Sequence, residues 1–188
     1  IYVDYVRKEI PGMTTGWWRG VGATHNSFMA ESFVDELAHK FSQDPYEYRL
    51  ARLGDSPRAK NVLEIAASKA NWSTPLPKGS GRGISVQFAF GSYVSQVVEV
   101  EVIEDQINIK KVVCVIDCGM VVNPNHVIAQ MEGGINFGIS GAMWGEITFN
   151  GGKVAQSNFH NYKVLRMNEA PKIEVHIVQN TEAPGGIG

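Results

Sequence analysis

The feature of this sequence that most limits its fold is a change in the spacing of its apolar residues near residue 79. Before that point apolar residues recur every three to four positions, which is typical of amphipathic helices. After it they alternate with polar residues, which is typical of half-buried strands. A stretch rich in Ser, Thr, Pro and Gly, residues 71–83, separates the two patterns. The sequence therefore predicts an α+β fold, with a mainly helical lobe over 1–78 and a β-rich lobe over 79–188.

Three helices are predicted in the first lobe, after an extended segment over 1–23. The first helix has about 16 residues, and its apolar face is predicted to be core. That face carries Phe28, Met29, Phe33, Val34, Leu37, Ala38 and Phe41. Asp44, Pro45 and Glu47 form a capping box that starts a second helix, which is predicted to end near Leu53. Ser56-Pro57 gives a similar signal for a third helix.

The second lobe is predicted to be a mostly antiparallel sheet interrupted by one helix. Alternating strands are expected around residues 84–90, 98–102, 107–109 and 173–177. Turns are expected at 104–106 and at Asn150-Gly151-Gly152. The helix has Asn123 as its cap and Pro124 as its first residue, and it contains Gly133, Gly134, Gly138 and Gly141.

Composition excludes several classes of protein. The chain has 17 Lys and Arg against 19 Asp and Glu and no basic run, so neither nucleic acid nor an anionic membrane surface is an expected partner. No apolar stretch approaches the roughly 18 residues of a membrane span. Two cysteines, Cys114 and Cys118, are too few for a disulfide scaffold or a zinc site and are predicted to be reduced and buried.

The five histidines show no metal-ligand spacing, and the motifs of serine hydrolases, zinc hydrolases and P-loop proteins are absent from the sequence. His39 and His176 are predicted to be solvated. His160 has two interpretations, a loop anchored by hydrogen bonds or a contact with substrate.

Two glycine-containing segments are candidates for a binding site, each with a structural alternative. The four glycines of the second-lobe helix indicate either close packing on a sheet or close approach of a planar or phosphorylated ligand, with Gln130 and Asn136 as amide donors. The Arg19-Gly20-Val21-Gly22 segment indicates either an anion or cofactor site at a helix start or a tight turn with a surface arginine.

Several motifs, taken in order, resemble a known family. They are Trp18-Arg19-Gly20-Val21-Gly22, the segment 115–124, Ala129-Gln130-Met131-Glu132-Gly133-Gly134, the segment 156–162 and the terminal segment 182–188. Together they resemble the molybdenum-binding large subunit of the xanthine oxidase and aldehyde oxidase family, of the isoquinoline 1-oxidoreductase β-subunit type. The resemblance covers nearly the whole chain.

The resemblance implies hydroxylation of an electron-poor carbon in an N-heterocycle or an aldehyde, with oxygen from water and a glutamate as base. It implies a molybdenum-bearing molybdopterin, with the cytosine dinucleotide as one candidate form, and a small 2Fe–2S partner subunit. Arg19, Gly20 and Gly22 would lie beside the cofactor, Gln130 would hydrogen-bond it, and Gly188 would end the loop that leads to the base. Val21 replaces the aromatic residue of xanthine-oxidising members, which disfavours purine as substrate.

The same resemblance predicts that this chain is a piece of a longer polypeptide. Its base is expected directly after Gly188, so none of its own residues is a predicted catalytic group or metal ligand. The isolated chain is expected to lack cofactor and activity and to self-associate. The alternative is a non-catalytic binding or scaffold module. Both a cytoplasmic and a periplasmic location stay open.

Overall fold

The computed structural model describes residue 4, residues 6–12 and residues 16–188. The predicted extended segment at Tyr2, Val3 and Tyr5 lies outside these residues. The helices and strands are, in order, α1 (Gly22–Lys40), α2 (Pro45–Leu50), α3 (Pro57–Lys69), β1 (Ser80–Ala89), β2 (Ser92–Ile103), β3 (Gln106–Asp117), α4 (Pro124–Trp144), β4 (Phe149–Asn150), β5 (Lys153–Val154) and β6 (Lys172–Ile177).

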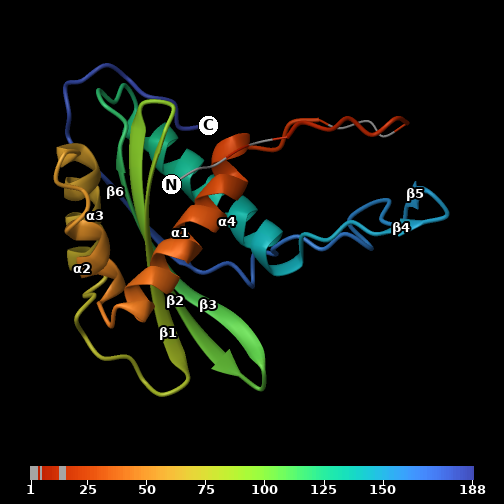
Figure 1. Cartoon of the computed structure of the whole chain (residues 1–188), viewed down its shortest axis with the longest axis horizontal. Coiled ribbons are helices and arrows are strands. Elements are labelled where there is room, and N and C mark those ends of the chain that lie inside the picture. Colours follow the sequence, from red (N-terminus) through yellow and green to blue (C-terminus); the bar gives the residue numbers. More distant parts are fainter. Residues whose placement is uncertain (1–3, 5, 13–15) are drawn as a thin grey trace.

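A four-stranded sheet in the order β1-β2-β3-β6 forms the centre of the fold (Figure 1). The β1–β2 and β2–β3 pairs are antiparallel, whereas β3 and β6 are parallel. The predictions of an α+β fold and of a mostly antiparallel sheet are therefore confirmed. The short β4–β5 hairpin belongs to an arm that extends away from the sheet (Figure 1).

Strand β3 is buried on both faces because successive side chains of a strand point to opposite sides. Val113 and Val115 face α3 and pack with its Leu63. Val112 and Cys114 face the other way and pack with Ile135 of α4. The fold thus has three layers, α3, sheet and α4, and the buried run of β3 has the continuous apolar sequence that such a strand requires. The α3 residues share one core with the strands, and the lobe boundary near residue 78 stays a prediction.

Most of the predicted turns and helix starts are confirmed. Asp44 caps α2 by accepting hydrogen bonds from the backbone N–H groups of Tyr46 and Glu47. Asn123 likewise caps α4. The β2–β3 turn lies at Glu104 and Asp105, which have positive φ angles of 49° and 63°. Ser56 is an exception, because it precedes α3 without a side-chain capping hydrogen bond.

The prediction that the apolar face of α1 is core is wrong. Phe28 is 75% exposed and Phe33 is 52% exposed, whereas Ala38 is buried. The helical period of this segment is correct, but the described elements cover only part of its apolar face, and its large aromatic residues stay exposed. Helix α1 also begins earlier than its apolar pattern, at Gly22, and α2 ends earlier than predicted, at Leu50 rather than Leu53.

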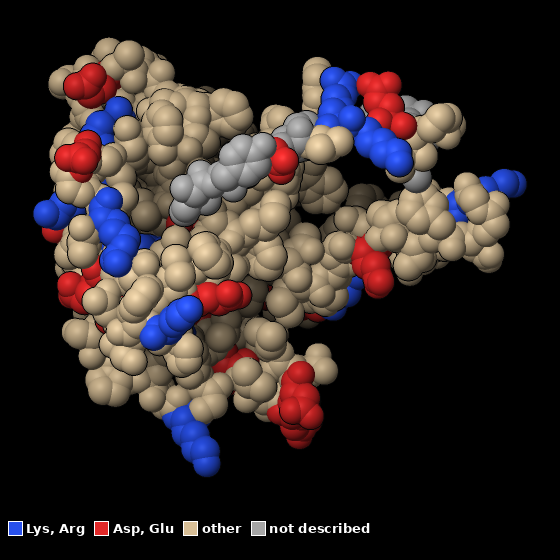
Figure 2. Space-filling view, in the orientation of Figure 1, with Lys and Arg blue, Asp and Glu red and all other residues tan. Residues whose placement is uncertain are grey.

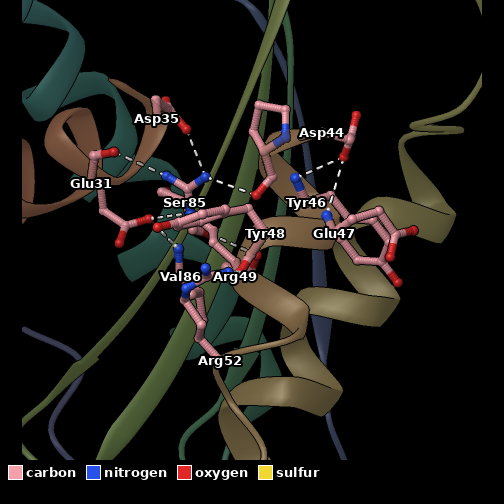
Figure 3. A network of polar contacts seen from close by, with 12 residues as sticks. Glu31, Asp35, Asp44, Tyr46, Glu47, Tyr48, Arg49, Arg52, Ser85 and Val86 are labelled. Atoms are coloured by element: carbon pink, nitrogen blue, oxygen red, sulfur yellow. Dashed lines mark hydrogen bonds and ion pairs between the residues drawn. The ribbon is translucent and has the colours of Figure 1, made fainter. Parts of the chain in front are cut away.

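Buried polar contacts instead hold α1 against α2 and β1 (Figure 3). Arg49, only 3% exposed, donates hydrogen bonds to the carboxylates of Glu31 at 2.9 Å and Asp35 at 2.6 Å. The Glu31 carboxylate also accepts a hydrogen bond from the backbone N–H of Val86 at 3.0 Å. One guanidinium therefore joins two turns of α1, and Glu31 links the same helix to the sheet.

Charges of both signs are interspersed on the face that carries α1 (Figure 2). Among the helices of the described residues, none has the length and apolar character that a bilayer crossing needs.

Both cysteines are free and buried, as predicted, and burial raises the pKa of the Cys114 thiol to about 12. Burial also raises the pKa of Cys118. Because the thiolate is the reactive form, we expect neither residue of the folded chain to react with a chromogenic disulfide reagent at about pH 8 within minutes. Both should react after unfolding in denaturant. Rapid reaction of one thiol in the folded chain would contradict this burial.

Candidate functional site

Three parts of the chain that are distant in sequence meet near the middle of α4. The Nη2 atom of Arg19, just before α1, donates a hydrogen bond to the backbone carbonyl of Gln130 at 3.3 Å. A Cβ atom built on Gly188 would lie 3.4 Å from the amide nitrogen Nε2 of Gln130. The structure therefore brings together Arg19, Gln130 and Gly188, which the sequence singled out. We call these three residues the Arg19 cluster.

The glycines of α4 face the Arg19 loop rather than the sheet. A Cβ atom on Gly134 would lie 3.5 Å from Nη2 of Arg19, and one on Gly141 would lie 3.8 Å from the Trp18 ring. The apolar residues Ile135 and Ile139 face the sheet instead. The interpretation of these glycines as a helix-on-sheet contact is therefore wrong.

Aromatic contacts, which sequence reasoning missed, fix the approach of the loop to the helix. The rings of Trp18 and Phe137 lie 5.0 Å apart, and Cζ of Arg19 lies 5.8 Å from the centre of the Phe137 ring. That separation permits a cation–π interaction. Phe137 follows Gln130 by seven residues, two helical turns, so the helical period could have placed both on one face.

The Arg19-Gly20-Val21-Gly22 segment turns sharply into α1. Gly20 has a φ of +82°, and a Cβ atom there would overlap the Thr24 hydroxyl, which itself donates a hydrogen bond to the carbonyl of Arg19 at 2.6 Å. Gly22 is the first residue of α1, and no side chain caps that end. The segment is thus a tight turn whose arginine is half-buried on α4, and no carboxylate of the described residues pairs with this arginine.

A cavity of about 700 Å³ lies next to the cluster, between α4 and the segment 147–165. Trp18 and Phe137 belong to its walls, together with Phe159, Tyr162 and Leu165. Neither Arg19 nor Gln130 lines it. The cavity therefore lies beside the Arg19 cluster, and the Trp18 and Phe137 side chains belong both to its wall and to the contacts around Arg19.

Several polar side chains beside the cavity form hydrogen bonds with one another or with the loop backbone. Gln156 bonds Thr148 through both ends of its amide, and Asn161 accepts hydrogen bonds from the backbone of Ser157 and Asn158. Hydrogen bonds of the neighbouring asparagines thus anchor the loop that carries His160. Asn136, the second predicted amide donor, has a buried Oδ1 without a hydrogen-bond partner among the described residues.

The histidines and acidic residues of the described chain form no group suited to a metal ion. His39 is exposed as predicted. The prediction that His176 is solvated is wrong, because its Nε2 is buried without a partner in the part of the chain that the structure describes. Burial and the nearby charge of Lys69 lower the pKa of this histidine.

Comparisons with known proteins identify relatives of this chain. Residues 16–171 match the model of the molybdopterin cofactor-binding domain. The chain is 36% identical over 177 residues to the β-subunit of isoquinoline 1-oxidoreductase from Brevundimonas diminuta, covering 91% of this chain and 22% of that protein. It is 31% identical over 213 residues to a nicotinate dehydrogenase subunit from Pseudomonas putida, covering 98% of this chain and 18% of that protein.

The fold is also that of solved structures. Aldehyde oxidoreductase of Desulfovibrio desulfuricans matches 90% of this chain and 36% of its own with a TM-score of 0.68 at 14% identity. The enzyme of Desulfovibrio gigas matches 89% of this chain and 36% of its own with a TM-score of 0.66 at 13% identity. With the domain match over most of its length, the chain belongs to the molybdopterin cofactor-binding domain family, within the xanthine oxidase family that its motifs indicated.

Proposed function

We propose that this chain is the cofactor-binding part of a molybdenum hydroxylase large subunit that hydroxylates N-heterocycles or aldehydes, with water as the oxygen source. The meeting of Arg19, Gln130 and Gly188 carries the proposal. The chain spans about a fifth of the length of the two curated relatives, so the activity belongs to a larger assembly. The names of those relatives, which include isoquinoline and nicotinate, support N-heterocycles as the substrate class.

The residues present fit a molybdopterin. Arg19 offers a half-buried guanidinium that lacks a carboxylate partner in the described chain, as an anionic phosphate or pterin carbonyl requires. Gln130 supplies an amide, and the Arg19 guanidinium lies against Gly133 and Gly134 on the next turn of α4, which places the two groups side by side. When bound, the molybdenum cofactor supplies the two-electron oxidation.

The residues of this chain position the cofactor and the base. Arg19 and Gln130 orient the cofactor. Gly20, with its φ of +82°, lets the loop turn tightly enough to bring Arg19 onto α4, and Gly22 begins α1 directly after that turn. Gly188 ends the segment beside Gln130, and a glutamate that acts as general base follows directly after it in the longer polypeptide. A base must come within hydrogen-bond reach of the proton that it takes, so the position of Gly188 sets where that base can act.

The aromatic cavity would receive the apolar ring of the substrate. Its volume of about 700 Å³ is within the range of ligand pockets, and its walls are largely aromatic and aliphatic. The remaining parts of the assembly are a small 2Fe–2S subunit that accepts the electrons and the pterin itself, for which the cytosine dinucleotide is one candidate form.

The whole activity can be tested by comparing this chain with the longer polypeptide that contains it. Purified with its small partner subunit, the longer polypeptide should hold near-stoichiometric molybdenum by mass spectrometry and reduce a dye with isoquinoline, nicotinate or an aldehyde. The 188-residue chain alone should be folded but free of metal and inactive, because it lacks the base and part of the cofactor enclosure. A longer polypeptide with neither metal nor turnover would favour the non-catalytic scaffold.

The role of Gln130 can be tested with Gln130→Glu in the same assembly. This change keeps the shape but replaces a donor with a negative charge. Since a hydrogen bond to a charged group contributes about 1.5–3 kcal/mol, molybdenum occupancy should fall about 10- to 100-fold at limiting cofactor. Gln43→Glu introduces the same change at an exposed position and should leave occupancy unchanged. Equal occupancy in both variants would remove Gln130 from the site.

The role of the cavity can be tested with Phe159→Ala. Loss of an aromatic wall should raise KM for isoquinoline about 5- to 10-fold, with molybdenum content unchanged. Phe149→Ala is the matched control, because Phe149 is exposed on the same arm but does not line the cavity. An unchanged KM for the Phe159 variant would show that the substrate binds elsewhere.

A further inference from the structure

The end of β3 carries a buried carboxylate that the proposed function has not used. Asp117 is 1% exposed and pairs with Arg58, the second residue of α3, through bonds of 2.8 Å and 2.7 Å. The side-chain amide of Asn180, just after β6, donates to both oxygens of Asp117, at 3.0 Å and 2.9 Å. The backbone N–H of Gly119 donates a further bond at 3.1 Å.

This carboxylate is therefore satisfied by donors from three directions. Its partners include a charged group, which offsets the cost of burying the carboxylate. The guanidinium of Arg58 in turn lies over the Tyr93 ring of β2, 4.8 Å from its centre. The hydrogen bond from Arg58 is the main cause of the lowered pKa of Asp117.

Asn180 connects this carboxylate to the terminal segment. Its Oδ1 accepts a hydrogen bond from the backbone N–H of Glu182 at 2.9 Å, an Asx turn that sets the direction in which the chain leaves β6. The segment then bonds to the ends of two strands. Met120 N–H donates to the carbonyl of Glu182, Gly185 N–H to that of Cys118 and Gly186 N–H to that of Phe90.

The fit along this path is tight because glycines face it. Gly119 has a φ of +72°, and a Cβ atom there would lie 2.8 Å from the carbonyl oxygen of Glu182 and overlap that of Ala183. A Cβ atom on Gly185 would lie 2.6 Å from the carbonyl carbon of Gly91. The segment is thus held from both sides before it reaches Gly188, and Gly188 lies against Gln130.

From these contacts we infer that Asp117 and Asn180 are positioning residues for catalysis. Through the Asx turn they fix the segment 182–188 and thereby the place at which the group after Gly188 meets the cofactor. The inference rests on the proposed function. It assigns a task to residues that touch neither the proposed cofactor site nor the cavity.

The experiment uses Asn180→Ala in the longer polypeptide with its partner subunit. Asp117 itself is a poor target because its removal leaves Arg58 unpaired against the core. Because a misplacement of about 1 Å can cost about 10²-fold in rate, kcat should fall by about that factor, with KM and molybdenum content within about twofold of the parent. Asn180→Ser can form the same turn more weakly and should recover part of the loss.

Hydrogen exchange measures the segment without relying on turnover. The amides of Gly185 and Gly186 should exchange at least about 10-fold faster in Asn180→Ala, because their bonds depend on the anchored turn. Asn108→Ala, at an exposed position near the β2–β3 turn, should change neither exchange at these amides nor kcat.

The outcomes separate this inference from the proposed function. If the unsubstituted longer polypeptide holds no molybdenum and shows no turnover, the proposed function is overturned. Faster exchange of the Gly185 and Gly186 amides in Asn180→Ala would still show that Asn180 anchors the segment 182–188. An active parent whose Asn180→Ala variant keeps its kcat would overturn the positioning role. So would a loss of kcat that merely follows a loss of molybdenum or of thermal stability.

Discussion

The structure depends on the burial of one strand on both of its faces. Val112 to Ile116 of β3 have no solvent-exposed side, because α3 covers one face and α4 the other. Such a strand fixes the separation of the two helices and the register of its neighbours. The same strand ends in Asp117. Its carboxylate therefore lies where it can bond both Arg58 of α3 and Asn180 just before the terminal segment.

Helix α1 is held by ion pairs rather than by burial of its aromatic residues. Its aromatic face is exposed, and Arg49 holds it through Glu31 and Asp35. Ion pairs demand defined geometry, whereas apolar faces tolerate sliding, so this attachment fixes the direction of a helix that follows directly from the Arg19 loop. The exposed aromatic residues favour contact with another surface, which agrees with the expected self-association of the isolated chain.

Local signals in the sequence predicted the elements, and the resemblance of motifs predicted the family. The cap at Asn123, the β2–β3 turn and the mostly antiparallel sheet follow from residue type and period. The burial of α1 could not be predicted in this way, because a period shows that one face is apolar and not that another element covers it. The contact of Arg19 with Gln130 joins residues 111 positions apart, which no local pattern encodes.

The glycines of α4 supply the strongest physical argument for a ligand at the Arg19 cluster. Each glycine within a helix costs up to about 1 kcal/mol relative to alanine. The nearest neighbours of a Cβ atom on Gly133, Gly134 and Gly141 would lie 3.5–3.8 Å away, an ordinary van der Waals distance, and Gly138 has no neighbour within 4 Å among the described residues. Alanine would therefore fit at all four positions, and the contacts of the described chain do not explain the glycines. A planar group on the helix backbone would explain them; the Arg19 guanidinium and the Trp18 ring occupy that face at three of the four positions, and it is open at Gly138.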